Sequence, residues 1–123
     1  MHSSSARRAG AIAAAGAVFS LACALAFAQA PPETAAVLKK GKDLFGANCR
    51  KCHGPSGRGN GPDADPDHMP ADLTASTNPE GVMFYKVWNG RKAPVMPPFK
   101  SSLTKDEIWT VVMYAKSLRT SGS

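Results

Sequence analysis

Two cysteines and a histidine lie within five residues of one another in the run Cys49-Arg50-Lys51-Cys52-His53. Two thiols at this spacing can add to the two vinyl groups of one haem as thioethers, and the adjacent imidazole then reaches the iron. The motif therefore predicts one covalently attached haem c per chain. Cys49 and Cys52 would be its tethers, and His53 would be an axial ligand.

These residues could also serve three other roles. A zinc site could combine Cys49, Cys52, His53 and His68, but neighbouring Cys52 and His53 would strain a tetrahedral site. A thioredoxin-like redox pair needs a βαβ context, whereas loop signals follow this motif and no convincing strand is found. A local disulfide between Cys49 and Cys52 is the third alternative. Haem attachment is the interpretation that we favour.

The opposite axial ligand must be a second imidazole or a thioether. The candidates are His68, Met69, Met83, Met96 and Met113. Met83 and Met113 fall within predicted helices, where methionine commonly fills the core. Met96 lies between Pro94 and Pro97-Pro98, whose stiffness would hold a weak thioether on the iron. We expect Met96, with His68 next; His/Met ligation leaves no open position, which suits electron transfer.

The N-terminal residues have the pattern of an export signal. Arg7 and Arg8 precede an alanine-rich apolar stretch, and Ala26-Phe27-Ala28 supplies an A-x-A cleavage site. We expect cleavage after Ala28 and a periplasmic protein. The alternatives are an uncleaved segment, which alone would associate the chain with a membrane, and a lipoprotein acylated at Cys23.

The charge of the chain favours protein partners over nucleic acid. Its 123 residues carry a formal net charge of +6, and removal of Arg7 and Arg8 with the signal would leave +4. A surface of this sign suits redox proteins with acidic docking surfaces. The basic residues are scattered, without a stripe or interleaved aromatic platform, so we expect no nucleic-acid partner.

The remaining sequence predicts helices separated by loops. Apolar residues recur at helical spacing from Thr34 to about Asn48, and close approach of another helix would explain Gly41 within that helix. The stretch from Gly54 to Pro70 is rich in glycine and proline and predicts a loop that wraps a haem edge.

Two further helices are predicted beyond this loop. Asn78 would cap the first, Pro79 would begin it and Asn89-Gly90 would end it, with Gly81, Phe84, Tyr85 and Trp88 on one face. A second loop would follow from Arg91 to Ser102. Thr104 and Glu107 form a capping box before a stripe of Ile108, Val111, Val112, Ala115 and Leu118. The predicted fold class is all-α, with three to four short helices.

These residues resemble the small monohaem class I cytochromes c, especially soluble bacterial ones and the cytochrome domains of oxidase third subunits. The likeness rests on Gly41 to Phe45, Cys49 to Gly54, Pro70 to Thr74, Met96 to Phe99 and Leu103 to Leu118. It implies a cytochrome c fold around one haem c over residues 34–120, after a signal peptide at 1–28 and a leader at 29–33.

The resemblance also implies particular contacts. The first and last helices would cross at Gly41, with Phe45 and Tyr114 packed beside the crossing. The carbonyl of Pro55 would accept a hydrogen bond from the free N–H of His53. Arg91 and Lys92 could pair with a haem propionate or simply be solvated.

The function implied by the resemblance is electron transfer rather than catalysis. The chain would be a periplasmic electron carrier with His53 and Met96 as axial ligands, or else a dedicated haem subunit of a dehydrogenase or terminal oxidase complex. Lys51, Lys92 and Lys100 would steer a redox partner toward the exposed haem edge.

Overall fold

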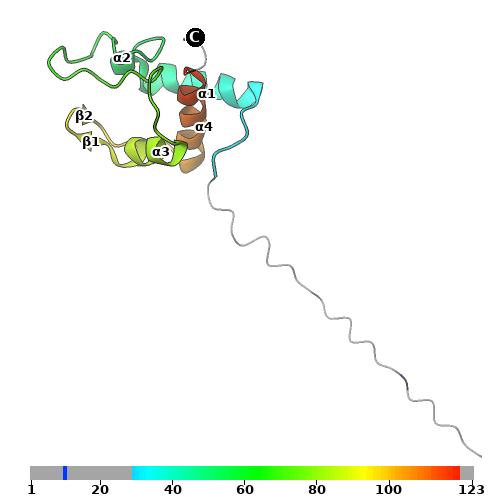
Figure 1. Ribbon diagram of the computed structural model, residues 1–123. Coiled ribbons are helices and arrows are strands. Elements are labelled where there is room, and N and C mark those ends of the chain that lie inside the picture. Colours follow the sequence, from blue (N-terminus) through cyan, green and yellow to red (C-terminus); the bar gives the residue numbers. More distant parts are fainter. Residues whose placement is uncertain (1–9, 11–28, 120–123) are drawn as a thin grey trace, which may run out of the picture.

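The computed structural model describes Gly10 and residues 29–119 (Figure 1). The predicted signal peptide and its cleavage site lie outside the described residues, apart from Gly10, so that prediction stays a prediction. Within the described part of the chain, no helix has both the length and the apolar character needed to cross a bilayer.

The first two helices carry the haem-attachment motif. Helix α1 spans Ala35–Asn48, and the Thr34 hydroxyl caps it by accepting a hydrogen bond from the Val37 N–H at 3.2 Å. Helix α2, Arg50–His53, is a single turn made by the motif itself. The predicted first helix is therefore confirmed, and its end delivers the chain directly into the motif.

The other two helices follow the long loop. Helix α3 spans Glu80–Asn89 and helix α4 spans Lys105–Ser117. The predicted capping box is present, because the Glu107 N–H donates to the Thr104 hydroxyl at 3.2 Å and the Thr104 N–H donates to Glu107 Oε2 at 2.9 Å. Helix α3 begins one residue later than predicted, since Pro79 has an extended ψ of 154° and acts as the cap in place of Asn78.

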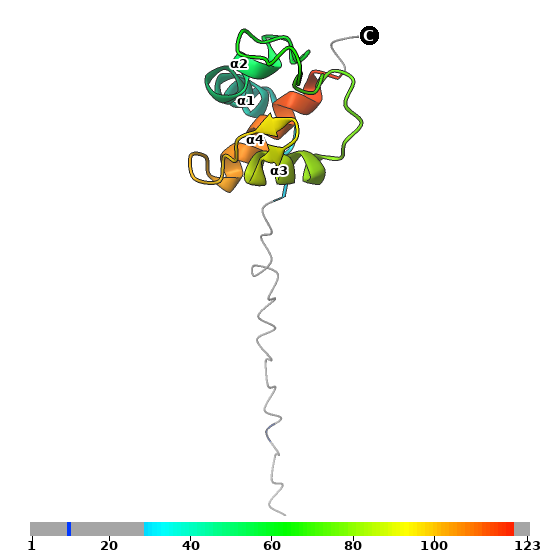
Figure 2. The ribbon, with the colours of Figure 1, turned by 90° about the vertical axis from the view of Figure 1, so that its left-hand side faces the viewer.

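Helices α1 and α4 cross in direct contact, as Figures 1 and 2 show. A Cβ atom on Gly41 would lie 2.6 Å from both the Thr110 carbonyl oxygen and the Tyr114 Cβ, so only glycine fits there without displacement. The rings of Phe45 and Tyr114 meet edge to face beside it, with centroids 5.4 Å apart. The predicted crossing at Gly41 is confirmed.

The core lies between α3 and α4. Its buried members are Met83, Ile108, Val112 and Ala115. Of the four residues placed on one face of this helix, Phe84 and Trp88 pack on the core together with Met83 and Val87. Gly81 is exposed and Tyr85 is 66 % exposed. The face of α3 that packs against α4 contains Met83, Phe84 and Val87. The Phe84 ring stacks on the Trp109 ring of α4, with centroids 4.4 Å apart.

A short hairpin interrupts the second predicted loop. Strand β1, Arg91–Lys92, pairs antiparallel with strand β2, Val95–Met96, through the Ala93-Pro94 turn. The prediction of no strand was therefore wrong, although two-residue strands leave the all-α fold class unchanged. The stretch 54–79 contains neither helix nor strand, in agreement with the predicted loop.

Candidate haem site

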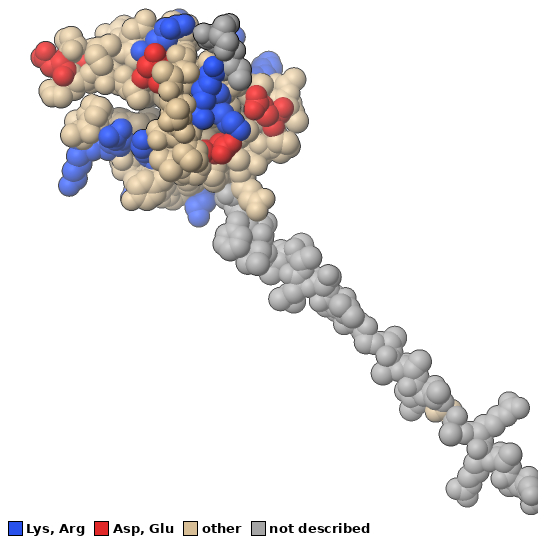
Figure 3. Space-filling view, in the orientation of Figure 1, with Lys and Arg blue, Asp and Glu red and all other residues tan. Residues whose placement is uncertain are grey.

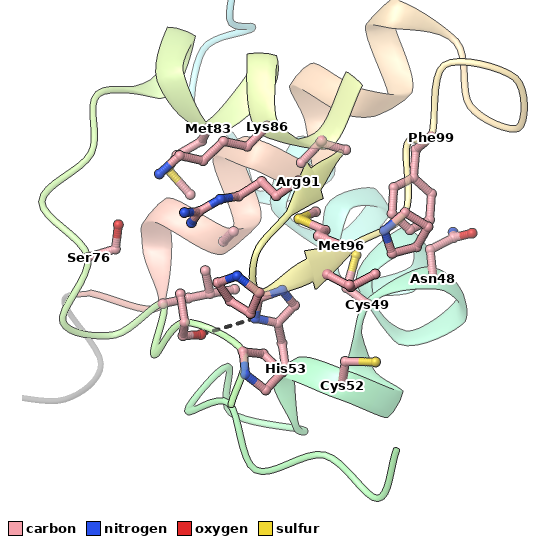
Figure 4. A pocket seen from close by; sticks show the side chains of 18 of the residues that line it. Asn48, Cys49, Cys52, His53, Ser76, Met83, Lys86, Arg91, Met96 and Phe99 are labelled. Carbon is pink, nitrogen blue, oxygen red and sulfur yellow. Dashed lines mark hydrogen bonds between the residues drawn. The ribbon is translucent and has the colours of Figure 1, made fainter. Parts of the chain in front are cut away.

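A cavity of about 360 Å³ lies between the α1–α2 segment with its following loop and the α3–hairpin segment (Figure 4). Its lining includes all four predicted site residues: Cys49, Cys52, His53 and Met96. Apolar side chains form much of its wall, namely Phe45, Leu73, Met83, Val87, Phe99, Val111, Val112 and Ala115. The structure thus brings together residues that lie up to 47 positions apart in the sequence.

Backbone hydrogen bonds from the following loop hold the motif in place. The Gly59 N–H donates to the His53 carbonyl at 2.8 Å, and the Gly61 N–H donates to the Cys52 carbonyl at 3.0 Å. These bonds satisfy carbonyl groups at the end of α2, where no further helical turn exists to do so. The loop therefore fixes the orientation of a helix too short to be stable alone.

The imidazole of His53 is oriented by a second backbone group. Its Nδ1 lies 3.1 Å from the Ala71 carbonyl oxygen, which accepts the Nδ1–H and leaves Nε2 free as a ligand atom. The prediction that Pro55 supplies this carbonyl was wrong, because the loop that follows the motif places the Ala71 carbonyl beside the His53 ring. Burial lowers the pKa of His53, and this effect outweighs the hydrogen bond to Ala71, which raises the pKa. The neutral imidazole, the form that a ligand needs, is therefore favoured.

The two thiols are free and half-buried, so they form no disulfide with each other. Burial, aided by the nearby Cys52, raises the pKa of the Cys49 thiol to about 12. Reactive redox cysteines need a lowered pKa, so this environment does not suit a thioredoxin-like pair. The motif also lies between α1 and a loop, remote in sequence from both described strands.

Three contacts position Met96 at the cavity. Met96 pairs with Arg91 across the hairpin, and the Phe99 N–H donates to the Val87 carbonyl at 2.9 Å, which ties the following segment to α3. Gly90 ends α3 with a φ of 69°, and a Cβ there would collide with the Met96 carbonyl oxygen. The close approach of these backbones requires the glycine that the sequence predicted as a helix cap.

The other candidate ligands are engaged elsewhere or lie away from the cavity. The Met83 sulfur accepts a hydrogen bond from Arg119 Nη2 at 2.9 Å, and Met113 is buried but absent from the lining. Met69 is 49 % exposed and also absent from it. His68 borders the cavity, but its side chain is 68 % exposed on the loop, where its Nδ1 lies 3.0 Å from Asp65 Oδ2.

This set of donors fits a haem c. Two free thiols and an oriented imidazole lie on the α1–α2 side of an apolar cavity, and a thioether lies on the hairpin that faces it (Figure 4). A zinc site fits less well: among residues 29–119 no group of three or more His, Cys, Asp or Glu side chains is arranged to hold a metal ion.

Sequence reasoning missed several polar residues of the cavity. Lys86, Ser76, Asn48 and Asn78 line it, and none was predicted there. Two of them carried a helical signal: Lys86 shares a face with Met83 and Val87 at i, i+3 and i+4, and Asn48 follows Phe45 by three residues in α1. The positions of Ser76 and Asn78 depend on the path of the loop.

Charges of both signs border the mouth of the cavity. Figure 3 shows a notch between two lobes, with basic side chains on the lower lobe and both acidic and basic ones on the upper lobe. Asp63 and Asp65 line the cavity from the loop, whereas Lys86, Arg91 and Lys92 line it from α3 and the hairpin.

Comparisons with known proteins agree with this geometry. Residues 36–114 match the protein family described as cytochrome c oxidase, cbb3-type, subunit III. No curated protein matches the chain. A chain of the reducing HAO-like protein complex Kustc0457/Kustc0458 from Kuenenia stuttgartiensis is 29 % identical, with a TM-score of 0.62.

That structural match covers 73 % of this chain and 47 % of the other, so the chain spans about half the length of its structural relative. The family match covers the motif, the loop, the hairpin and most of α4. The match to this cytochrome c domain indicates an electron-transfer protein that binds haem c rather than an enzyme in itself. On the extent of this match, the chain belongs to the cbb3-type cytochrome c oxidase subunit III family of c-type cytochromes.

Proposed function

We propose that this chain carries a single haem c and passes electrons one at a time between redox proteins in the periplasm. Cys49 and Cys52 form the two thioether bonds, and His53 and Met96 are the axial ligands. The haem supplies one-electron exchange between ferric and ferrous iron. The observation that carries the proposal is the convergence of these four side chains on one cavity.

The choice of Met96 rests on what its rivals contact. The Met83 sulfur already accepts a hydrogen bond, Met113 and Met69 do not border the cavity, and the His68 side chain is 68 % exposed on the loop. Met96 lines the cavity from the hairpin, on the side opposite α2 (Figure 4). A Met sulfur there closes the coordination shell and raises the reduction potential relative to a second histidine.

The protein contributes positioning and exclusion of water. The Ala71 carbonyl orients His53 and increases the electron donation of its Nε2, since a ligand imidazole that donates its other N–H is a stronger base. The apolar wall keeps water from the ligand positions. With both positions filled by protein, the site suits electron transfer rather than oxygen or peroxide activation.

A dedicated haem subunit of a larger oxidoreductase complex is the second candidate function. The family name refers to an oxidase subunit, and the structural relative is a longer chain within a complex, of which the match covers 47 %. Co-purification of a stable partner chain under native conditions would favour this candidate, whereas isolation as a free monomer would favour the carrier.

The axial ligand is tested by Met96→Ala, with Met83→Leu as the matched control. Ferric haem with a methionine ligand has a weak long-wavelength absorption band, which Met96→Ala should abolish while covalent haem remains. Its reduction potential should also fall, because the remaining ligand set stabilises ferric iron more. Met83→Leu should retain the band. Persistence of the band in Met96→Ala would refute the assignment.

A further inference from the structure

The polar groups of the cavity are unevenly distributed. Figure 4 shows Lys86, Arg91 and Ser76 on one side of it, and Cys49 and Cys52 on the other. The loop segment that carries Asp63 lies at the cysteine side, since Cys52 Sγ is 3.9 Å from the Asp63 carbonyl oxygen. The end of the cavity with Lys86 and Arg91 is therefore cationic, whereas the loop segment that carries Asp63 lies at the opposite end, beside the cysteines.

Neither cation has a carboxylate partner within the part of the chain that the structure describes. Arg91 Nη2 donates only a long hydrogen bond of 3.4 Å to the Ala93 carbonyl, and the half-buried Lys86 makes no ion pair. The half-buried charge of Lys86 beside an apolar wall is costly unless an opposite charge meets it, whereas Arg91 is exposed and lines the same cavity. This end of the cavity is suited to an anion.

We infer that Lys86 and Arg91 bind the haem propionates and thereby raise the reduction potential. The inference rests on the haem attachment proposed above. Haem carries its vinyl groups and its two propionates on different edges, so thioether bonds at Cys49 and Cys52 direct the propionates away from the cysteines. In this cavity, that direction leads to Lys86 and Arg91.

The two positive charges have a predictable electrostatic effect. Reduction adds one electron to the iron, so nearby positive charge favours the ferrous state. Pairing with the propionates also cancels negative charge that would otherwise oppose reduction. Loss of either cation should therefore shift the equilibrium toward the ferric state, without altering the axial ligands.

The test compares the reduction potentials of Lys86→Gln, Arg91→Gln and the charge-retaining Arg91→Lys. Lys100→Gln is the matched control, because it removes the same charge from an exposed loop residue outside the cavity lining. Each of the two glutamine variants, Lys86→Gln and Arg91→Gln, should lower the equilibrium constant for reduction by roughly three- to tenfold. Arg91→Lys should retain most of the wild-type value, and Lys100→Gln should change it less than about twofold.

The haem spectrum and a haem stain after denaturing electrophoresis show whether each variant carries covalent haem, so the proposed function is tested separately from the inference. A wild-type chain without covalent haem would refute the proposed function itself. If Lys86→Gln and Arg91→Gln contain haem and their reduction potentials shift no more than that of Lys100→Gln, the inference is overturned and the function is left intact. A glutamine variant that fails to retain haem, while its charge-retaining counterpart retains it, would support the inference.

Discussion

The His53 ring shows how much of a site a motif can specify. Its position directly after Cys52 predicted a ligand histidine, and the structure places it in the same cavity as both cysteines. Its hydrogen-bond acceptor could not be read from the motif. Ala71 lies 18 residues away, and only the path of the intervening loop brings its carbonyl to the ring in place of that of Pro55.

Lys86 and Arg91 illustrate the same limit for charged residues. The sequence left two outcomes open for Arg91, propionate pairing or solvation, and did not single out Lys86, because a lysine in a helix is usually solvated. Their place at the cavity follows from the face of α3 that packs on α4 and from the register of the hairpin. Both are tertiary properties.

The ion pair between Glu80 and Lys116 should make stability depend on pH. Lys116 Nζ donates to Glu80 Oε1 across α3 and α4, and this hydrogen bond lowers the pKa of Glu80 from its ordinary value of 4.5. The pair therefore stabilises the fold above that value and loses its effect as pH falls through the lowered pKa. In Lys116→Met, the free energy of unfolding should fall less steeply as the pH is lowered below about 5.

Guanidinium unfolding at a series of pH values measures this slope. Lys39→Met is the control, because it removes an exposed pair within α1, where Lys39 Nζ lies 3.2 Å from Asp43 Oδ2. Exposed pairs contribute little, so Lys39→Met should follow the wild-type curve. An unchanged slope in Lys116→Met would show that the α3–α4 pair does not couple to folding.

At the scale of elements, local signals predicted α1 and α4 more completely than the segment that presents Met96. Thr34 and the Thr104–Glu107 capping box satisfy helix N–H groups within their own segments, so those helix starts were readable from the sequence. The hairpin was missed because each strand has only two residues, too short to show an alternating pattern. Its pairing depends on the turn and on contacts with α3.

The crossing of α1 and α4 makes a sharp prediction at Gly41. Gly41→Ala should destabilise the protein by about 1–2 kcal/mol, because overpacking against the Thr110 carbonyl and Tyr114 exceeds the helix-propensity gain of about 1 kcal/mol. The matched control is Gly46→Ala in the same helix. A Cβ there meets nothing within 4 Å, so a gain of about 0.5–1 kcal/mol is expected.

Unfolding by guanidinium, followed by circular dichroism, distinguishes the two glycines. Opposite signs for Gly41→Ala and Gly46→Ala would confirm that the crossing, and not helix propensity, requires glycine at position 41. Equal stabilisation of both variants would mean that the helices separate easily at this point, and would contradict the tight contact.

The whole molecule is built around the cavity rather than around a large protein core. Only seven described hydrophobic side chains are buried, and several of them also line the cavity. A large apolar group there would complete a core that this small chain cannot form by itself. The mouth also carries both signs of charge, so an acidic docking partner, expected from net charge alone, stays a prediction.

The central claim is a covalently held haem whose two axial positions are both filled by the protein. The most direct measurement is the optical spectrum of the purified protein, oxidised and reduced, with and without carbon monoxide at neutral pH. A low-spin spectrum unchanged by carbon monoxide is the predicted result, because His53 and Met96 leave no open position. A high-spin spectrum that shifts on adding the gas would contradict the claim and indicate a gas-binding or peroxide-reacting haem.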